Sequence, residues 1–250
     1  MTLRCTGIRK SYGGLHVLHG VGFEVAPGEI LGLCGANGAG KTTLMDIIGG
    51  QQSMNAGAVE LAGEALVGDT ARRARAGLAR TFQHPQVATD LSLRENIALG
   101  LAGGRIGSFG ALVRGLFAGI VEGACAGMEL VEAAAEHLSL GGLGRRAGDV
   151  TFGELRLVEL ARALVQQPKL IMLDEPFSGV GDGGIAAIIE ALRRIRAQGT
   201  AVLLIDHNVD LLTALADRMA LLAQGAIVVE GTVEACLADE MFRRTYIGAV

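Results

Sequence analysis

The chain has 250 residues, half of them apolar, with 26 acidic against 22 basic side chains and a net charge of -4. This length and apolar content fit one large folded domain and argue against disorder. The slight acidic excess argues against nonspecific binding to nucleic acid through a large positively charged surface. The cysteines are scattered, with no C-x-x-C pair or nearby histidine at metal-ligand spacing, so reduced thiols without chemistry are expected. They are Cys5, Cys34, Cys125 and Cys236.

The ends and surface of the chain give no membrane signal of their own. Residues 1–10 lack the apolar stretch of a secretory signal, and no uncharged run approaches the roughly 18 to 20 residues needed to span a bilayer. Any membrane role is therefore expected to use a partner. The densest basic cluster, Arg72, Arg73 and Arg75, is interpreted as a solvated helix face rather than a polyanion site.

The first strong structural signal is a strand, a glycine loop and a helix in that order. Apolar and polar residues roughly alternate over residues 17–25, and Pro27-Gly28 then predicts a turn. The apolar run Ile30–Cys34 predicts a buried strand, and residues 41–48 have helical composition.

The loop matches the pattern Gly35-x-x-x-x-Gly40-Lys41-Thr42 of a phosphate-binding P-loop. Glycines let backbone N–H groups surround a phosphate, and the following helix start carries about half a positive charge. We expect Lys41 to hold the β- and γ-phosphates and Thr42 to ligate Mg²⁺. An accidental match in a glycine-rich chain is the alternative, but lysine is scarce and the strand and helix stand in the right places. The predicted nucleotide-binding residues here are Gly35, Ala36, Asn37, Gly38, Ala39, Gly40, Lys41, Thr42 and Thr43.

Two further apolar runs, residues 170–173 and 201–205, predict strands separated by an amphipathic helix, which indicates a mostly parallel sheet. Asp174 and Glu175 directly follow the first of these runs. In a P-loop sheet this edge faces the phosphates, so Asp174 is predicted to support Mg²⁺ and Glu175 to polarise the attacking water. Taken alone, such a pair would more often cap a helix or loop.

Between about residues 91 and 150 the strand signals vanish, and this stretch predicts an inserted helical subdomain. Ser92 and Glu95 match a capping box, worth about 1 kcal/mol, and residues 128–138 are compatible with a helix. The links are rich in glycine, including Gly103-Gly104 and Gly141-Gly142.

A second candidate helix start is Thr151-Phe152-Gly153-Glu154. Thr151 and Glu154 match another capping box, and the apolar residues that follow repeat at helical spacing. The segment is either a simple cap or a second anion-binding helix start.

Three segments together, GANGAGKTT, LIMLDEP and VTFGELRLVELARAL, resemble the ATP-binding subunits of ABC transporters over nearly the whole chain. The ATPases of branched-chain amino-acid importers and their amide or urea relatives are the most similar branch. This similarity rests on RTFQHP, the long segment after SLRENIAL, and the ending Tyr246-Ile247-Gly248.

The resemblance implies an α/β fold: a P-loop NTPase core with a mostly parallel sheet, an N-terminal antiparallel β portion and an inserted α-helical subdomain. It implies one ATPase domain over residues 1–250. The nucleotide-binding core would take residues 1–90 and 151–232, the helical subdomain residues 91–150, and a helical tail residues 233–250.

The resemblance also assigns roles. Tyr12 would stack on adenine, Gln83 would sense Mg²⁺ and the γ-phosphate, and His207 would act as the switch histidine on the γ-phosphate. Thr151, Gly153 and Glu154 occupy the family's signature segment, which binds the ATP held by a partner subunit. Without the resemblance, Tyr12 is an ordinary aromatic, Gln83 a turn glutamine and His207 a structural histidine.

Two segments depart from the family's usual residues. The common signature is Leu-Ser-Gly-Gly-Gln, whereas here Phe152 replaces a glycine and Glu154 adds a negative charge. Residues 178–181 stand where Ser-Ala-Leu-Asp is usual and lack the aspartate, although Asp182 follows one position later. Phosphate contact by the Thr151 hydroxyl is expected to survive.

The implied assembly contains ATP, Mg²⁺, a second ABC ATPase subunit (identical or related), integral membrane permease subunits and, indirectly, a solute-binding protein, without nucleic acid. Its location would be peripheral, at the cytoplasmic face of the inner membrane. Three alternatives remain open. They are an ABC-type ATPase that acts on DNA, ribosomes or cluster assembly, a P-loop GTPase or small-molecule kinase, and a non-hydrolysing regulatory subunit.

Overall fold

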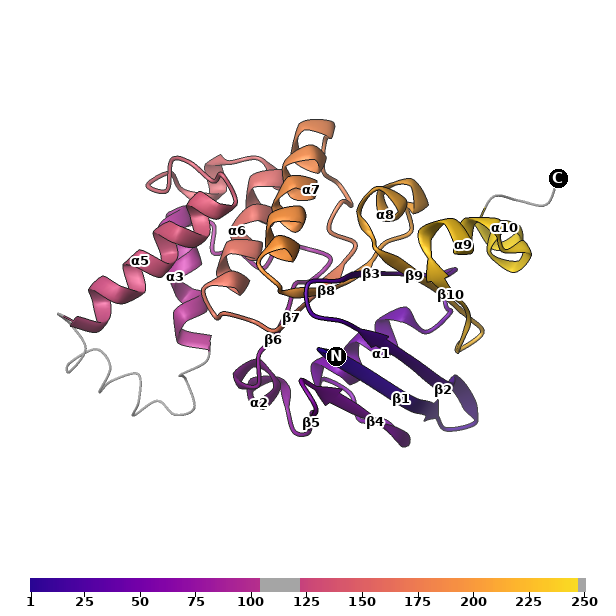
Figure 1. Cartoon of the computed structure of the whole chain (residues 1–250). Coiled ribbons are helices and arrows are strands. Elements are labelled where there is room, and N and C mark those ends of the chain that lie inside the picture. Colours follow the sequence, from indigo (N-terminus) through magenta and orange to yellow (C-terminus); the bar gives the residue numbers. More distant parts are fainter. Residues whose placement is uncertain (104–121, 247–250) are drawn as a thin grey trace. The chain divides into compact units, whose positions relative to one another are not determined.

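The computed structural model describes residues 1–103 and 122–246, and they form two compact units (Figure 1). The first unit contains Met1–Arg80, Lys169–Glu175 and the chain from Ile195 onward, and the second contains Thr81–Pro168 and Pro176–Arg194. Gly104 and the ending Ile247-Gly248, on which part of the sequence interpretation rests, lie outside the described residues.

A six-stranded sheet organises the first unit, in the order β10-β9-β3-β8-β7-β6. All neighbours run parallel except β9 and β10, which form an antiparallel pair. The predicted strands at residues 30–34, 170–173 and 201–205 are confirmed, and the central strands are buried along their length. The bounds are β3 (Ile30–Cys34), β6 (Leu78–Arg80), β7 (Leu170–Asp174), β8 (Ala201–Ile205), β9 (Arg218–Ala223) and β10 (Ala226–Thr232).

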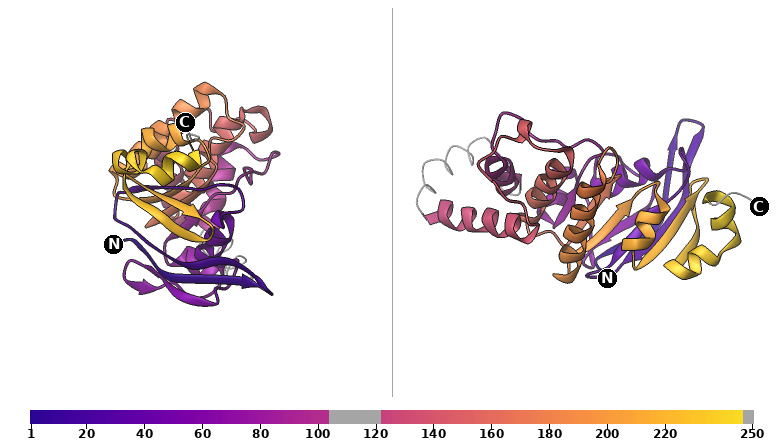
Figure 2. Two further views of the ribbon diagram at one scale, coloured as in Figure 1. Left: turned by 90° about the vertical axis from the view of Figure 1, so that its right-hand side faces the viewer. Right: turned by 90° about the horizontal axis from the view of Figure 1, so that it is seen from above.

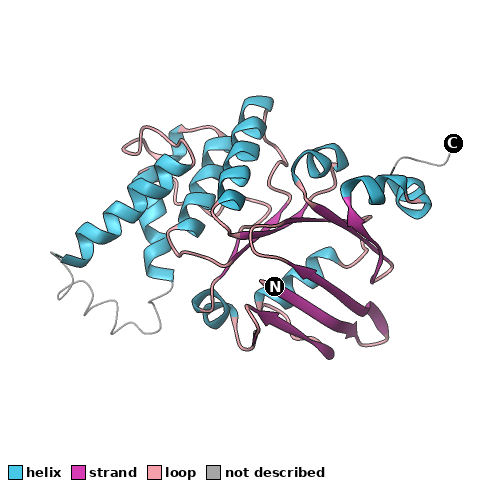
Figure 3. Ribbon diagram, viewed as in Figure 1, coloured by secondary structure: helices cyan, strands magenta, loops and turns pink. Residues whose placement is uncertain are grey.

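The predicted N-terminal antiparallel portion is a second, four-stranded sheet in the order β2-β1-β4-β5 (Figure 3). It contains β1 (Leu3–Tyr12), β2 (Leu15–Val25), β4 (Ala56–Leu61) and β5 (Glu64–Ala65). The alternation predicted for residues 17–25 places Val21, Phe23 and Val25 in the interior.

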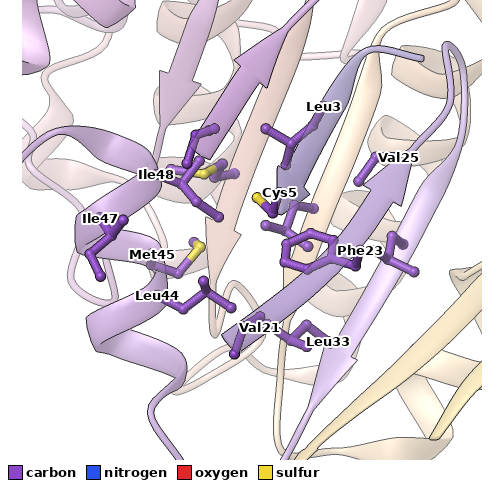
Figure 4. Close-up of a cluster of buried hydrophobic side chains, with 14 of the residues drawn as sticks. Leu3, Cys5, Val21, Phe23, Val25, Leu33, Leu44, Met45, Ile47 and Ile48 are labelled. Atoms are coloured by element: carbon purple, nitrogen blue, oxygen red, sulfur yellow. The ribbon is translucent and has the colours of Figure 1, made fainter. Parts of the chain in front are cut away.

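The core of this unit joins both sheets to α1 (Lys41–Gly49). Leu3 and Phe23 from the antiparallel sheet, Leu33 from β3, and Met45 and Ile48 from α1 belong to one buried cluster (Figure 4). Each such side chain contributes about 1.5–3 kcal/mol on burial. The helix that follows the glycine loop is therefore held by apolar packing along its length, which fixes its first turn in place.

The interpretation of Arg73 as part of a solvated helix face is wrong. Arg72 and Arg75 of α2 (Thr70–Arg75) are exposed, but Arg73 is buried. Its guanidinium donates to the carbonyl oxygens of Ile47 (2.6 Å) and Ile48 (2.7 Å), at the end of α1. The last carbonyls of a helix lack internal donors, so a buried cation that satisfies them stabilises α1.

Three more helices complete the first unit: α8 (Val209–Leu215), α9 (Val233–Ala238) and α10 (Glu240–Tyr246). α9 packs on the antiparallel pair β9 and β10, and α10 packs on α9 (Figure 2). Cys236 of α9 is buried there, and Cys5 and Cys34 are buried elsewhere in this unit.

The second unit is helical over its described residues and contains α3 (Leu93–Gly103), α5 (Glu122–His137), α6 (Phe152–Leu164) and most of α7 (Asp182–Ala197). The capping box predicted at Ser92 and Glu95 is confirmed: Glu95 N–H donates to Ser92 Oγ (3.2 Å), and Ser92 N–H donates to Glu95 Oε2 (2.8 Å). Over residues 1–103 and 122–246, no helix combines the length and apolar character that crossing a bilayer requires.

Candidate functional site

The glycine loop joins β3 to α1 in the first unit. α1 begins at Lys41, and Gly40 is its N-cap in a left-handed conformation (φ 106°). No side chain caps this helix, and its first turn contains no acidic residue. The first N–H groups of a helix have no acceptor within the helix, so this start is available to an anion.

Two loop glycines stand where a side chain has no room. A Cβ on Gly35 would lie 2.4 Å from the Leu222 carbonyl oxygen, and a Cβ on Gly40 would lie 2.7 Å from Leu18 Cδ2. Gly38, in contrast, has open space around it but a φ of 80°. A backbone atom blocks a side chain at position 35, so packing requires glycine there, whereas the left-handed backbone favours glycine at positions 38 and 40.

Lys41 holds its ammonium group over the beginning of the loop. Nζ donates to the carbonyl oxygens of Gly35 (2.5 Å) and Ala36 (3.1 Å). Burial lowers the pKa of Lys41, and the negative charges of Glu175 and Asp174 partly oppose that shift. A cation in the field of two carboxylates at a helix start is suited to the terminal phosphates of a nucleotide.

Asp174 is the last residue of β7, and a basic side chain approaches it from β6. Arg80 Nη1 donates to Asp46 Oδ1 (2.8 Å), and Arg80 Nη2 lies 3.8 Å from Asp174 Oδ2. Burial raises the pKa of Asp174, while Arg80 opposes the rise. The sequence interpretation missed Arg80, although a cation three residues before Gln83 on a short strand was a readable signal.

Glu175 has a left-handed backbone (φ 47°), which costs a non-glycine residue roughly 1–2 kcal/mol. Its N–H donates to the Ile205 carbonyl oxygen (2.8 Å), at the end of the neighbouring strand β8. His207 Nδ1 lies 3.8 Å from Glu175 Oε1 and 3.7 Å from Asp206 Oδ1. The parallel strand ends thus bring the predicted base and the predicted switch histidine side by side.

Asp206, between β8 and His207, is buried to 1% exposure. Its Oδ1 accepts a hydrogen bond from Asn208 N–H (2.9 Å). Burial raises the pKa of Asp206, and that hydrogen bond partly opposes the rise. The sequence interpretation gave Asp206 no role, because an acid at a strand end is usually a cap.

The signature-type segment begins α6 in the second unit, and its predicted capping box is confirmed. Thr151 is the N-cap: its Oγ1 accepts from Glu154 N–H (3.3 Å), and Glu154 Oε2 accepts from Thr151 N–H (3.0 Å). A Cβ on Gly153 would lie 2.9 Å from Gly184 Cα of α7, so two helix backbones meet here. Gly153 is required by that close approach.

Gln83 belongs to a segment of the second unit that α6 holds by its backbone. The buried Arg156 guanidinium donates to the carbonyl oxygens of Phe82 (2.5 Å) and Gln83, and to Glu159 Oε2 (3.1 Å). Glu159 Oε1 in turn accepts from Gln86 N–H (2.9 Å). Burial raises the pKa of Glu159, although the Gln86 hydrogen bond and Arg156 oppose the rise. Arg156 and Glu159, an opposite-charge pair three residues apart in an apolar helix, were a missed sequence signal.

Tyr12 and Asp182 occupy surface positions at element ends. Tyr12 is the last residue of β1 and is 44% exposed, with Lys10 Nζ 4.8 Å from its ring centroid. An exposed ring of this kind is available for stacking on a base. Asp182 is exposed in the first turn of α7, directly after Gly181.

In the first unit the structure therefore gathers Lys41, Asp174, Glu175 and His207 around one loop. Gln83, Thr151, Gly153 and Glu154 belong to the second unit, where α6 connects them. A buried strand, a glycine loop that opens an uncapped helix, and an acid pair at a parallel strand end define a P-loop nucleotide-binding protein.

Comparisons with known proteins narrow this class. The family described as ABC transporter matches residues 18–178. Among relatives, the high-affinity branched-chain amino acid transport ATP-binding protein LivG of Escherichia coli strain K12 is 31% identical over 98% of this chain and 97% of its own. The Nod factor export ATP-binding protein I of Paraburkholderia xenovorans is 34% identical over 94% of this chain and 72% of its own.

A solved structure gives the same answer for the fold. The ADP conformation of MJ1267, an ATP-binding cassette of an ABC transporter, is 30% identical, with a TM-score of 0.85 and 99% of each chain covered. The chain belongs to the ABC transporter family, as a nucleotide-binding ATPase subunit with the predicted P-loop NTPase fold.

Proposed function

We propose that this subunit energises import of branched-chain amino acids, or of related amides or urea, through separate integral membrane subunits. Similarity to LivG over nearly the full length of both chains supports the amino-acid assignment. A smaller part of the relative with an export name is matched, since this chain covers 72% of its length. In this proposal a solute-binding protein delivers cargo to the permease, and the ATPase sits peripherally at the cytoplasmic face of the inner membrane.

The observation that carries the hydrolytic mechanism is the pairing of Glu175 with His207, 3.8 Å apart at the ends of adjacent parallel strands. In the proposal, Lys41 and the α1 amides bind the β- and γ-phosphates, and Tyr12 stacks on the adenine. Glu175 accepts the proton of the attacking water, and His207 contacts the γ-phosphate. The left-handed backbone of Glu175 directs this carboxylate and is held by the Ile205 hydrogen bond.

The residues available for Mg²⁺ fit that ion. It prefers hard oxygen ligands, and the Thr42 hydroxyl and the Asp174 carboxylate are of this kind. Arg80, whose Nη2 lies 3.8 Å from Asp174 Oδ2, favours the ionised carboxylate and so opposes the rise in pKa that burial gives Asp174. When bound, Mg²⁺ would neutralise phosphate charge, and Gln83 would be the residue that senses this ion and the γ-phosphate.

A single chain would not complete this site. The signature segment Thr151 to Glu154 would instead bind the γ-phosphate of ATP held on a second ABC ATPase, identical or related. ATP would thus join two helix starts from different subunits, and phosphate loss would let them separate. This cycle is what the membrane subunits would convert into transport.

Glu175→Gln tests the assignment of the base. We expect hydrolysis to fall by roughly 10³-fold while Mg-ATP binding persists and an ATP-bound dimer accumulates on size exclusion, because only the proton acceptor is lost. Glu190→Gln, on α7 in an exposed ion pair, is the control and should hydrolyse ATP normally. Hydrolysis at the wild-type rate by Glu175→Gln would remove Glu175 from this role.

Import needs a separate test. The tagged chain, purified from membranes, should bring integral membrane partners, and branched-chain amino acids with their binding protein should raise the ATPase rate of the reconstituted complex. Recovery with ribosomes or DNA would instead support the alternative ATPase without a membrane partner. Stimulation of the ATPase rate by urea or an amide alone would instead assign the transporter to import of those solutes.

A further inference from the structure

Both carboxylate oxygens of Glu154, the unusual acid of the signature segment, accept hydrogen bonds. Oε2 accepts from Thr151 N–H (3.0 Å) and Thr151 Oγ1 (3.1 Å), as a capping box requires. Oε1 accepts from Arg145 Nη2 (2.6 Å), a charge-assisted bond. Although partial burial raises the pKa of Glu154, the bonds from Arg145 and Thr151 outweigh it and lower the pKa.

Arg145 is itself held in place before α6 begins. Its Nη2 donates to the Gly141 carbonyl oxygen (3.1 Å), and its N–H donates to the Gly142 carbonyl oxygen (2.9 Å). Gly142 has a φ of 64°, and a Cβ there would lie 2.5 Å from Arg145 Nε. The glycine link 141–142 is therefore shaped around this arginine, which is positioned toward Glu154 by its own turn.

The charge balance at the helix start matters for an anion. The capping box satisfies the N–H groups of Thr151 and Glu154. The N–H groups of Phe152 and Gly153, like those of any first helical turn, have no acceptor within the helix. A helix start supplies only about half a positive charge, so an unpaired carboxylate in the first turn would outweigh it. The guanidinium of Arg145 cancels that carboxylate and restores a start that attracts phosphate.

We propose that Arg145 is a positioning residue of the ATP site completed between two subunits: it compensates Glu154 so that the Thr151 segment accepts the γ-phosphate held by the partner. This inference rests on the proposed function of the signature segment. It assigns Arg145 no contact with ATP, since its side chain acts through Glu154.

The test compares Arg145→Ala, Glu154→Gln and the double variant, each in the Glu175→Gln background, by the ATP concentration that gives half-maximal dimer on size exclusion. Arg145→Ala should raise this concentration about 10-fold, and more at low salt, because an uncompensated carboxylate repels the phosphate. Glu154→Gln should lower it, because Arg145 is then an uncompensated positive charge, and the double variant, in which the charges again balance, should return to the concentration of the Glu175→Gln parent.

Two controls separate charge compensation from damage to the fold. Arg94 forms an exposed ion pair with Glu132 in the same unit, with an N–O distance of 2.8 Å and the same 46% side-chain exposure as Arg145, so Arg94→Ala should leave dimer formation unchanged. Fluorescent-nucleotide binding to the monomer, which uses the P-loop of the first unit, should be equal in all variants.

Each outcome decides the proposal. The proposal is overturned if Arg145→Ala dimerises at the same ATP concentration as the Glu175→Gln parent. It is also overturned if the double variant is as defective as Arg145→Ala, because Arg145 would then only stabilise the conformation of its own loop. If the Glu175→Gln parent binds ATP but never dimerises, the function of the signature segment itself has failed, and that result is distinguishable from failure at Arg145.

Discussion

The two helix starts assigned to phosphate binding are built in opposite ways. The N-cap of α1 is Gly40, which has no side chain to cap the helix, and the first turn contains no acid. The N-cap of α6 is Thr151, whose capping box with Glu154 satisfies two backbone N–H groups. One start is left open for a ligand, whereas the other is already satisfied in part by its own side chains.

This difference suits the two tasks. α1 needs no cap because its core side chains, such as Met45 and Ile48, and the Arg73 bonds at its end hold it without a ligand. α6 presents its start to a partner subunit in the proposed cycle, so it must stay ordered while nothing is bound. A capping box worth about 1 kcal/mol serves that need, at the expense of an acid beside the phosphate.

The largest expected effect comes from replacing the phosphate-binding side chain at each helix start, Lys41→Ala at α1 and Thr151→Ala at α6. Lys41→Ala should weaken Mg-ATP binding by the isolated chain by roughly 10³-fold, about 4 kcal/mol, because the charged contact to two phosphates is lost. Thr151→Ala should bind ATP normally as a monomer and fail to dimerise. Titration with a fluorescent nucleotide checks both, and equal loss in the two variants would contradict the division of labour.

Arg156→Met tests how α6 holds the Gln83 segment. Removal of one partner from the buried Arg156–Glu159 pair should lower the free energy of unfolding by about 3 kcal/mol, because Glu159 is left buried and uncompensated. Urea denaturation measures this effect. The double variant Arg156→Met/Glu159→Met should recover much of the loss; equal instability would show that the backbone bonds to Phe82 and Gln83, not the ion pair, carry the stability.

Local patterns predicted the helices, strands and caps of both units well, and the side-chain contacts between distant segments less completely. The glycine loop, the apolar strands and both capping boxes depend on near neighbours in the sequence, and the structure contains them where they were expected. The sequence did not predict the contacts of three arginines, because their partners lie far along the chain or beyond a turn. They are Arg73, Arg80 and Arg145. An exposed and a buried arginine look alike in sequence, and only tertiary packing separates Arg73 from Arg72.

Two alanine variants of the loop, Gly35→Ala and Gly38→Ala, distinguish the cost of a steric clash from the cost of a left-handed backbone. Gly35→Ala should destabilise the nucleotide-free protein by about 2 kcal/mol, because its Cβ meets the Leu222 carbonyl oxygen. Gly38→Ala has space and should lose only about 1 kcal/mol, from its left-handed backbone. Thermal unfolding without nucleotide measures both, and the reverse ranking would mean that the loop relaxes freely around position 35.

The smallest expected effect is the pH dependence that the acid gives to α6 and that α1 lacks. The pKa of Glu154 is lower in the folded chain than the ordinary 4.5, so the folded state binds this proton more weakly than the unfolded state. The ionised form therefore stabilises the fold above that range, by about 1 kcal/mol in a partly exposed cap, and the contribution disappears as pH falls through the lowered pKa.

The unfolding free energies of the wild type and Glu154→Gln, compared from pH 7 to pH 3, should differ most at pH 7 and converge in acid. Glu95→Gln is the matched variant: Ser92 likewise lowers the pKa of Glu95, and among residues 1–103 and 122–246 no arginine donates to its carboxylate. It should converge over the same pH range with a smaller amplitude. A difference between wild type and Glu154→Gln that stays constant with pH would mean that the bonds from Thr151 and Arg145 do not stabilise the ionised Glu154 carboxylate. The pairing of Arg145 with Glu154 would then not distinguish the start of α6 from that of α1.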